Sequence, residues 1–233
     1  MKAIILAGGF GLRLQESVKN LPKPMAPITG RPFLEYLVLQ LKKWEINEII
    51  LGVGYLKEKI KSYFGNGKQW DVHIIYSEEN KPLGTGGALK KAVELIDDEE
   101  FLVMNGDSFL DLDFNRIISF HRKQKAVATI GLACVDDLSR YGKVEINNKN
   151  EVIKFAEKGS SAGRFINGGV YVFTREIINY IPVGKVSLEN DVFHCLINQG
   201  LYGVVTKGFF VDIGMPQDFL DLCKDPERLL NVV

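Results

Sequence analysis

Short apolar segments alternate with amphipathic segments over the first 130 residues, and this alternation limits the possible folds more than any other feature of the chain. The apolar segments are strand-like and cover residues 2–7, 48–54, 72–77, 101–105 and 126–135. The segments with the apolar spacing of helices cover residues 31–44, 85–96 and 113–124. This alternation predicts an α/β fold with a doubly wound, mixed and mostly parallel sheet.

The pattern changes after about residue 136. Residues 144–158 contain two strand-like runs around an Asn/Lys turn, which predicts a β-hairpin. The other expected elements are a strand at 166–173, a helix at 189–199, short strands on either side of 207–208, and a last helix from 216. No linker or internal repeat divides the 233 residues, and their 46% hydrophobic content suffices for one large core. We therefore expect a single domain, 1–233, with halves at 1–130 and 131–233.

The charge balance and the chain start exclude several classes of protein. Twenty-nine basic and 29 acidic residues cancel, which argues against a dedicated nucleic-acid or anionic-membrane surface. No apolar run is long enough to cross a bilayer, and the chain enters a strand directly, without a signal peptide. These features predict a cytoplasmic protein with no nucleic-acid or membrane partner. They leave open whether it forms a homo-oligomer.

The cysteines and histidines are too scattered to form a recognisable site. The three cysteines lack C-x-x-C spacing, so we expect reduced core thiols and no disulfide scaffold or zinc ribbon. The three histidines show no H-E-x-x-H pattern, and we assign none of them a catalytic role. The six residues are Cys134, Cys195, Cys223, His73, His121 and His194.

The first strand runs directly into a glycine-rich loop, LAGGFGLRL. Gly8, Gly9 and Gly11 free the backbone to approach a ligand closely, and Arg13 follows on the same loop. Glycines after a strand can also simply make a turn, but with the added cation the combination favours a phosphate-binding loop.

Two better-known phosphate loops are excluded by single residues. Leu14 stands where the third glycine of the dinucleotide-binding pattern G-x-G-x-x-G belongs, which argues against the hypothesis of a nicotinamide oxidoreductase. Arg13 stands where the second glycine of the P-loop pattern G-x-x-x-x-G-K-[ST] belongs.

Two aspartates and one lysine complete the candidate site. Asp107 in VMNGDS and Asp212 in GFFVDIG each follow a strand-like run. Either one alone could equally cap a helix or turn, but two carboxylates beside a phosphate loop suit Mg²⁺. Lys23 lies between Pro22 and Pro24, which stiffen the backbone around it as a positioned cation requires.

The ordered set of motifs resembles the sugar-1-phosphate nucleotidyltransferase family. The matching segments are LAGGFGLRL, LPKPM, PLGTGGAL, NGDS, YGKVE, EKG, NGGVY and VDIG, which together span nearly the whole chain. Within the family the sequence is most similar to the D-glycero-D-manno-heptose 1-phosphate guanylyltransferases, with the mannose-1-phosphate guanylyltransferases as near neighbours. The resemblance implies a Rossmann-like nucleotidyltransferase fold, in which a small β-hairpin region binds the sugar.

The resemblance also implies roles for individual residues, with NTP and sugar 1-phosphate as substrates. Lys23 would balance charge at the α-phosphate, Lys158 would hold the sugar phosphate, and Asp107 and Asp212 would bind Mg²⁺. The implied nucleotide-binding residues are Leu6, Ala7, Gly8, Gly9, Gly11, Arg13, Lys23, Glu79, Gly84, Thr85 and Asp107. The implied sugar-phosphate-binding residues are Gly142, Glu157, Lys158, Asn167 and Gly168. The first half would thus bind mainly nucleotide and the second mainly sugar phosphate.

Two departures from the family pattern and several alternatives stay open. Leu12 replaces a common Thr or Ser, and EKG replaces E-K-P. Glu79 is a candidate acceptor for guanine N–H groups, and its alternative is a solvated loop charge. The other open readings are a mannose-1-phosphate guanylyltransferase, a glucose-1-phosphate uridylyl- or thymidylyltransferase, and a non-catalytic nucleotide-sugar sensor subunit.

Overall fold

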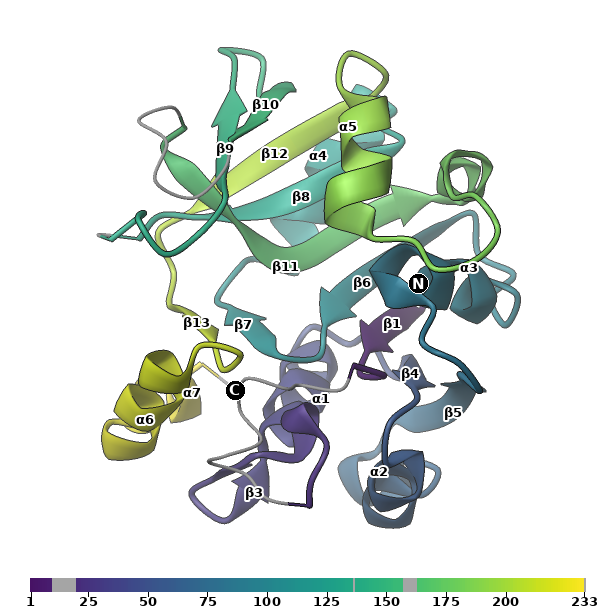
Figure 1. The fold of residues 1–233 in the computed structure, drawn as a ribbon, viewed down its shortest axis with the longest axis vertical. Coiled ribbons are helices and arrows are strands. Elements are labelled where there is room, and N and C mark those ends of the chain that lie inside the picture. The colour runs from purple at the N-terminus through teal and green to yellow at the C-terminus, as the bar shows by residue number, and fades with distance from the viewer. Residues whose placement is uncertain (10–19, 136, 157–162, 233) are drawn as a thin grey trace.

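The computed structural model describes residues 1–9, 20–135, 137–156 and 163–232, and these build a nine-stranded central sheet (Figure 1). Its strand order is β10-β9-β11-β6-β1-β4-β5, and β8 pairs with both β11 and β12. Its strands are β1 (Ala3–Leu6), β4 (Glu48–Val53), β5 (His73–Glu78), β6 (Glu100–Asn105), β8 (Ala128–Ala133), β9 (Lys143–Ile146), β10 (Val152–Ala156), β11 (Phe165–Thr174) and β12 (Leu201–Thr206). Two small ribbons pair β7 (Ser108–Leu110) with β13 (Phe210–Asp212), and β2 (Pro27–Ile28) with β3 (Arg31–Pro32).

Most strands of the central sheet point the same way. β1 is parallel to β4 and β6, and β4 is parallel to β5. β11 is antiparallel to both β6 and β8, so β8 and its parallel partner β12 run in the direction of β6. The predicted mixed, mostly parallel α/β sheet is therefore confirmed, and the predicted hairpin is formed by β9 and β10.

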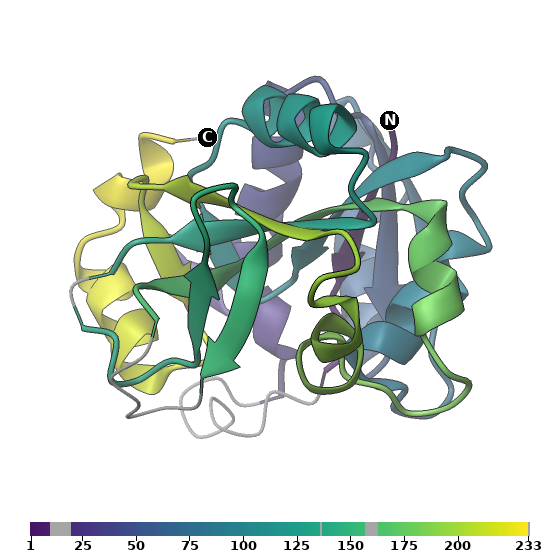
Figure 2. The same cartoon turned by 90° about the horizontal axis from the view of Figure 1, so that it is seen from above.

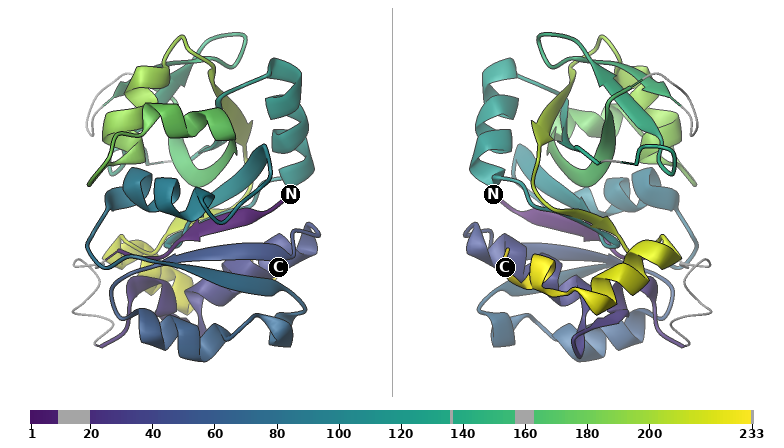
Figure 3. Two further views of the ribbon diagram at one scale, coloured as in Figure 1. Left: turned by 90° about the vertical axis from the view of Figure 1, so that its right-hand side faces the viewer. Right: turned by 90° about the vertical axis from the view of Figure 1, so that its left-hand side faces the viewer.

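Helices cover both faces of the sheet (Figures 2 and 3). They are α1 (Phe33–Lys43), α2 (Lys57–Phe64), α3 (Gly84–Val93), α4 (Phe114–Gln124), α5 (Phe193–Leu196), α6 (Pro216–Lys224) and α7 (Glu227–Leu230). In β1, Ala3 and Ile5 join the core that contains residues of α1, α4 and α6, whereas Ile4 joins the core of α3 and α5. Because successive strand residues face opposite sides, the wholly apolar run of β1 is explained by burial on both faces.

The helix predicted at 189–199 is shorter and less regular than expected. A π-helical turn, η5 (Leu188–Val192), precedes the four residues of α5, and the chain leaves the helix at Ile197, whose ψ is 128°. The hydroxyl of Ser187 accepts a hydrogen bond from the N–H of Asn190 and caps the start of the turn. Helix α2 was not predicted.

The prediction that all three cysteines are core thiols is wrong for two of them. Cys195 and Cys223 are exposed, and Cys134 is half-buried. On α5 the core-facing positions are taken by Phe193 and Leu196, and on α6 by Phe219 and Leu222, so each cysteine is turned outward. None of the described helices is long and apolar enough to span a membrane.

His121 on α4 is a buried group that should make stability depend on pH. Its ring is 1% exposed, Nδ1 lies 2.9 Å from the Oγ1 atom of Thr129, and Nε2 has no hydrogen-bond partner among the described residues. Burial lowers the pKa of His121 to about 4 from 6.5. The unfolded chain therefore binds one more proton than the folded chain between these values.

We expect the free energy of unfolding to fall as the pH drops through 6.5 towards 4, by roughly 2–3 kcal/mol from this residue alone. Urea unfolding of the wild type and of His121→Gln at pH 7.5, 5.5 and 4.5 measures the effect. The wild type should lose more stability than the variant over this range. Parallel pH profiles would show that His121 does not titrate as expected.

Candidate functional site

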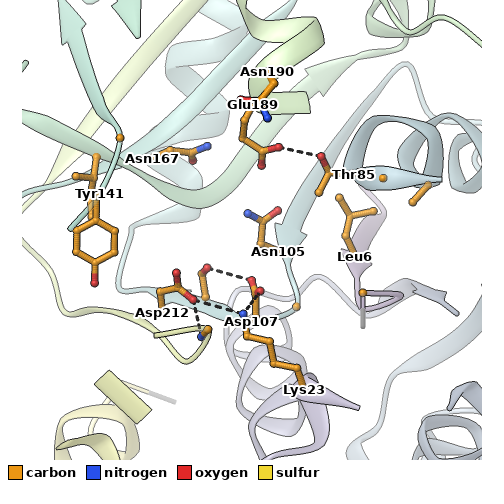
Figure 4. Close-up of a pocket in the computed structure, with 18 of the residues that line it drawn as sticks. Leu6, Lys23, Thr85, Asn105, Asp107, Tyr141, Asn167, Glu189, Asn190 and Asp212 are labelled. Carbon is orange, nitrogen blue, oxygen red and sulfur yellow. Dashed lines mark hydrogen bonds and ion pairs between the residues drawn. The ribbon is translucent and has the colours of Figure 1, made fainter. Parts of the chain in front are cut away.

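A cavity of about 1230 Å³ opens at the carboxyl ends of β1 and β6 (Figure 4). β1 contributes Leu6 and the loop residues 7–9, and β6 contributes Asn105 and the turn 106–108. The start of α3, the β9–β10 hairpin, β11 and η5 supply the other walls. Residues from both halves of the chain therefore line one cavity.

The backbone beside β1 is packed too closely for side chains at two glycines. A Cβ atom on Gly8 would lie 2.3 Å from Oε1 of Glu79, and one on Gly106 would lie 2.7 Å from the carbonyl oxygen of Leu6. A Cβ on Gly9 would meet nothing within 4 Å among the described residues. At Gly8 the loop therefore runs close to Glu79 and to Gly54 after β4, and the turn after β6 approaches the end of β1 at Gly106. Gly11 and Arg13 lie outside the described residues.

Asp107, Asp212 and Lys23 meet at one end of the cavity, as Figure 4 shows. The Nζ atom of Lys23 lies 2.5 Å from Oδ2 of Asp107 and 3.7 Å from Oδ1 of Asp212. Asp212 Oδ1 also accepts a hydrogen bond from the N–H of Gly214 at 2.7 Å. Strand β13, which ends at Asp212, pairs with β7, which starts just after Asp107, so the ribbon fixes the two carboxylates as neighbours.

The electrostatics of this pair suit a divalent cation. Burial and repulsion from Asp107 raise the pKa of Asp212 to about 6, although the Lys23 ammonium acts in the opposite direction. Both carboxylates already share one small cation, the Lys23 ammonium, so a metal ion near that position would be within reach of both. Among the described residues no group of three or more His, Cys, Asp or Glu gathers as a complete metal cage. Mg²⁺ is usually bound by one or two carboxylates, with phosphates and water at the remaining coordination positions, and this pair fits that pattern.

Those residues predicted at the nucleotide side that the structure describes line the cavity, but two of them have structural partners of their own. The Thr85 hydroxyl accepts from the N–H of Leu188 at 2.8 Å and donates to Oε2 of Glu189 at 2.9 Å. Gly84 has a φ of +70°, and a Cβ there would lie 2.4 Å from the carbonyl oxygen of Val186. Thr85 and Gly84 therefore join α3 to the chain before and within η5.

Glu79 lies at the turn before α3 and is half-buried. Its Oε2 atom accepts a hydrogen bond from the N–H of Leu83 at 2.9 Å. Burial raises the pKa of Glu79 above its ordinary value. The carboxylate lines the cavity beside Gly8, so the alternative of a freely solvated loop charge does not describe it.

On the sugar side the structure brings together some of the predicted residues and not others. Gly142 and Asn167 line the cavity. Gly168 does not: it is buried, and a Cβ on it would lie 2.5 Å from Leu110 Cδ2 and 2.9 Å from the carbonyl oxygen of Gly131. Glu157 and Lys158 lie outside the described residues.

Sequence reasoning missed several polar residues of the cavity wall. Glu189, Asn190 and His194 come from η5 and α5, and Asn105 ends β6. The segment 189–199 was interpreted only as a helix, and its polar face carried no motif. The Ser187 cap before three polar residues was the only local signal that could have marked an irregular, ligand-facing turn.

Comparisons with known proteins give matches over nearly the whole chain. A family model described as "Nucleotidyl transferase" matches residues 2–228. The chain is 41% identical to a D-glycero-alpha-D-manno-heptose 1-phosphate guanylyltransferase of Aneurinibacillus thermoaerophilus, over 99% of this chain and 100% of that one. It is 38% identical to the protein of the same name from Campylobacter jejuni, over 94% and 97% of the two chains. The crystal structure of HddC from Yersinia pseudotuberculosis complexed with GMP-PN superimposes with a TM-score of 0.84, at 34% identity over 96% of this chain and 98% of that one.

Proposed function

The chain belongs to the nucleotidyl transferase family, and on this premise we propose that it transfers GMP from GTP to D-glycero-α-D-manno-heptose 1-phosphate. The products are a GDP-heptose for surface polysaccharide and pyrophosphate. One observation carries this proposal: a full-length relative with that activity in its name is 41% identical. The cavity of this chain supports it, because loop residues 7–9, Lys23 and two carboxylates line one cavity, in which a triphosphate and a sugar phosphate could meet.

The chemistry needs positioning and charge neutralisation more than proton transfer. The attacking oxygen belongs to a phosphate that is already an anion, so no general base is required. Lys23 balances negative charge at the α-phosphorus, and backbone 7–9 with Arg13 holds the triphosphate. Lys158 and Asn167 orient the sugar phosphate for in-line attack. Asp107 and Asp212 would hold Mg²⁺, which when bound neutralises charge on the phosphates.

Guanine selection is assigned to the turn before α3. Glu79 Oε2 is occupied by the Leu83 N–H, and Oε1 lies against Gly8 at the cavity wall. The carboxylate can accept from the N1–H and N2–H donors of guanine, which uracil and thymine do not present in that arrangement. The Thr85 hydroxyl has its two partners within the protein, so we assign it to positioning α3 and not to the base.

A grid of substrates tests the proposal directly. GTP, ATP, UTP, CTP and dTTP are each paired with the 1-phosphates of heptose, mannose, glucose and N-acetylglucosamine, and pyrophosphate release is measured. GTP with the heptose 1-phosphate should give the highest kcat/KM. NTPs with another base should have a kcat/KM several orders of magnitude lower, because they leave buried polar groups of the base pocket unpaired. UTP or dTTP with glucose 1-phosphate as the best pair would reject the guanylyltransferase. Mannose 1-phosphate as the best partner of GTP would move the chain to that neighbouring activity.

A further inference from the structure

A buried phenol joins two amides that line the cavity. The hydroxyl of Tyr171, on β11, accepts a hydrogen bond from Nδ2 of Asn167 at 2.9 Å and another from Nδ2 of Asn105 at 3.2 Å. Asn105 ends β6 in the first half of the chain, and Asn167 is the third residue of β11 in the second. Tyr171 itself is 0% exposed and does not line the cavity. One oxygen that no substrate reaches thus connects a residue from each half.

The aromatic ring that carries this oxygen is held firmly. It stacks on Phe173 with centroids 5.5 Å apart and an interplanar angle of 9°, and it contacts Phe193 at 5.4 Å. Burial raises the pKa of Tyr171 well above its ordinary value, so the phenol stays neutral and keeps its proton. The oxygen is therefore a fixed hydrogen-bonding point and does not act as an acid or base.

The amide of Asn167 is fixed at both of its polar atoms. While Nδ2 donates to Tyr171, Oδ1 accepts from the N–H of Gly169 at 3.0 Å. Gly169 has a φ of +74°, a backbone conformation that favours glycine and brings its N–H back to the Asn167 side chain. An amide nitrogen carries two protons, so one N–H of Asn167 is left for a ligand, and its direction is set by Tyr171.

Asn105 completes the connection. Its Oδ1 atom is buried without a hydrogen-bond partner among the described residues. Tyr171 accepts in both hydrogen bonds, so the two amides share its one phenol oxygen. The three side chains then form a chain from Asn167 through Tyr171 to Asn105.

We propose that Tyr171 is a positioning residue for nucleotidyl transfer, which sets the Asn167 amide for the sugar phosphate through its phenol oxygen. This inference rests on the proposed function, because it takes a sugar 1-phosphate as the ligand beside Asn167. Tyr171→Phe removes only the oxygen and keeps the stacked ring. Without that oxygen the Asn167 amide keeps only its hydrogen bond from Gly169, so its N–H groups are held less firmly toward the sugar phosphate.

The expected result is a drop of about tenfold in kcat/KM for the sugar 1-phosphate, the size of one orienting hydrogen bond, with the KM for GTP within about twofold of wild type. Tyr36→Phe is the matched control. Tyr36 is also 0% exposed and its hydroxyl also makes two hydrogen bonds, to Thr29 and to the carbonyl oxygen of Ile28, but it does not line the cavity. It should lose stability without changing either kinetic constant.

A double-mutant cycle separates positioning from general loosening. If Tyr171 acts through Asn167, Tyr171→Phe should change kcat/KM by less than about twofold in an Asn167→Ala background. Independent, multiplicative effects would overturn the inference, as would a Tyr171→Phe enzyme with wild-type kinetics or one whose two substrates are affected equally.

Binding measurements keep this test independent of turnover. Calorimetry measures the Kd of heptose 1-phosphate for protein loaded with a non-hydrolysable GTP analogue, in wild type, Tyr171→Phe and Tyr36→Phe. Weaker binding only in Tyr171→Phe supports the inference. Equal binding in all three overturns the inference and leaves the proposed function intact, whereas absence of binding to the wild type overturns the proposed function and the inference with it.

Discussion

Asp212→Asn is expected to lower kcat by roughly a hundredfold or more while the fold stays intact, because the variant removes one of two carboxylates arranged for a divalent cation. The amide keeps the shape of the side chain and can still accept from the N–H of Gly214. What it loses is the negative charge beside Asp107. Asp107→Asn should behave in the same way, and both variants should need more Mg²⁺ to reach half of their maximal rate.

The measurement is a Mg²⁺ titration of initial rate, joined to a binding experiment that needs no turnover. Free Mn²⁺ measured by electron paramagnetic resonance in the presence of a non-hydrolysable GTP analogue reports the metal affinity of each variant. Asp71→Asn, whose side chain is 87% exposed and pairs with Lys42, serves as the control and should match wild type. Full activity of Asp212→Asn at the wild-type Mg²⁺ requirement would remove Asp212 from the metal site, and the same result for Asp107→Asn would remove Asp107.

The acidic pair was predictable because each aspartate follows a strand-like run. The carboxyl ends of parallel strands meet at one edge of a sheet, which places Asp107 beside the loop after β1. Asp212 reaches the same edge by another route, since β13 does not belong to the central sheet and pairs with β7 instead. The sequence therefore predicted that Asp212 lies near Asp107, but it did not predict the pairing of β13 with β7 that brings the two together.

The parts that sequence reasoning missed depend on long-range contacts. Helix α2 buries only Ile60 and Phe64, so its apolar stripe was too narrow to stand out. The antiparallel insertion of β11 between β6 and β8 cannot be read from an apolar run, because burial on both faces produces the same pattern in either direction.

Individual side-chain roles were harder to predict than positions in the fold. Thr85 lines the cavity, yet its hydroxyl is used by Leu188 and Glu189, which lie 103 and 104 residues further along the chain. Gly168 shows the same limit, since packing against Leu110 explains it without a ligand. A motif places a residue near a site, but only the tertiary contacts show which of its atoms are free to bind.

Lys23→Met is expected to reduce kcat by at least a hundredfold with a smaller change in the KM for either substrate. Charge at the α-phosphorus is greatest in the transition state, so a cation that balances it contributes more there than in the ground state. Methionine retains much of the length of the lysine stem, so the variant tests the charge and not the packing. Lys42→Met, which breaks an ion pair with Asp71 on the protein surface, is the matched control.

The same variant gives a second result that does not involve turnover. In the free protein the Lys23 ammonium lies between Asp107 and Asp212 and offsets part of their repulsion. Removing it leaves two facing carboxylates without a counter-charge, so Mn²⁺ should bind the nucleotide-free variant more tightly than the nucleotide-free wild type. A loss of kcat with tighter metal binding would assign Lys23 to the phosphate and the aspartates to the metal. A lower kcat together with weaker Mn²⁺ binding would mean instead that Lys23 holds the carboxylates in place. The proposed role of Lys23 at the α-phosphate would then be wrong.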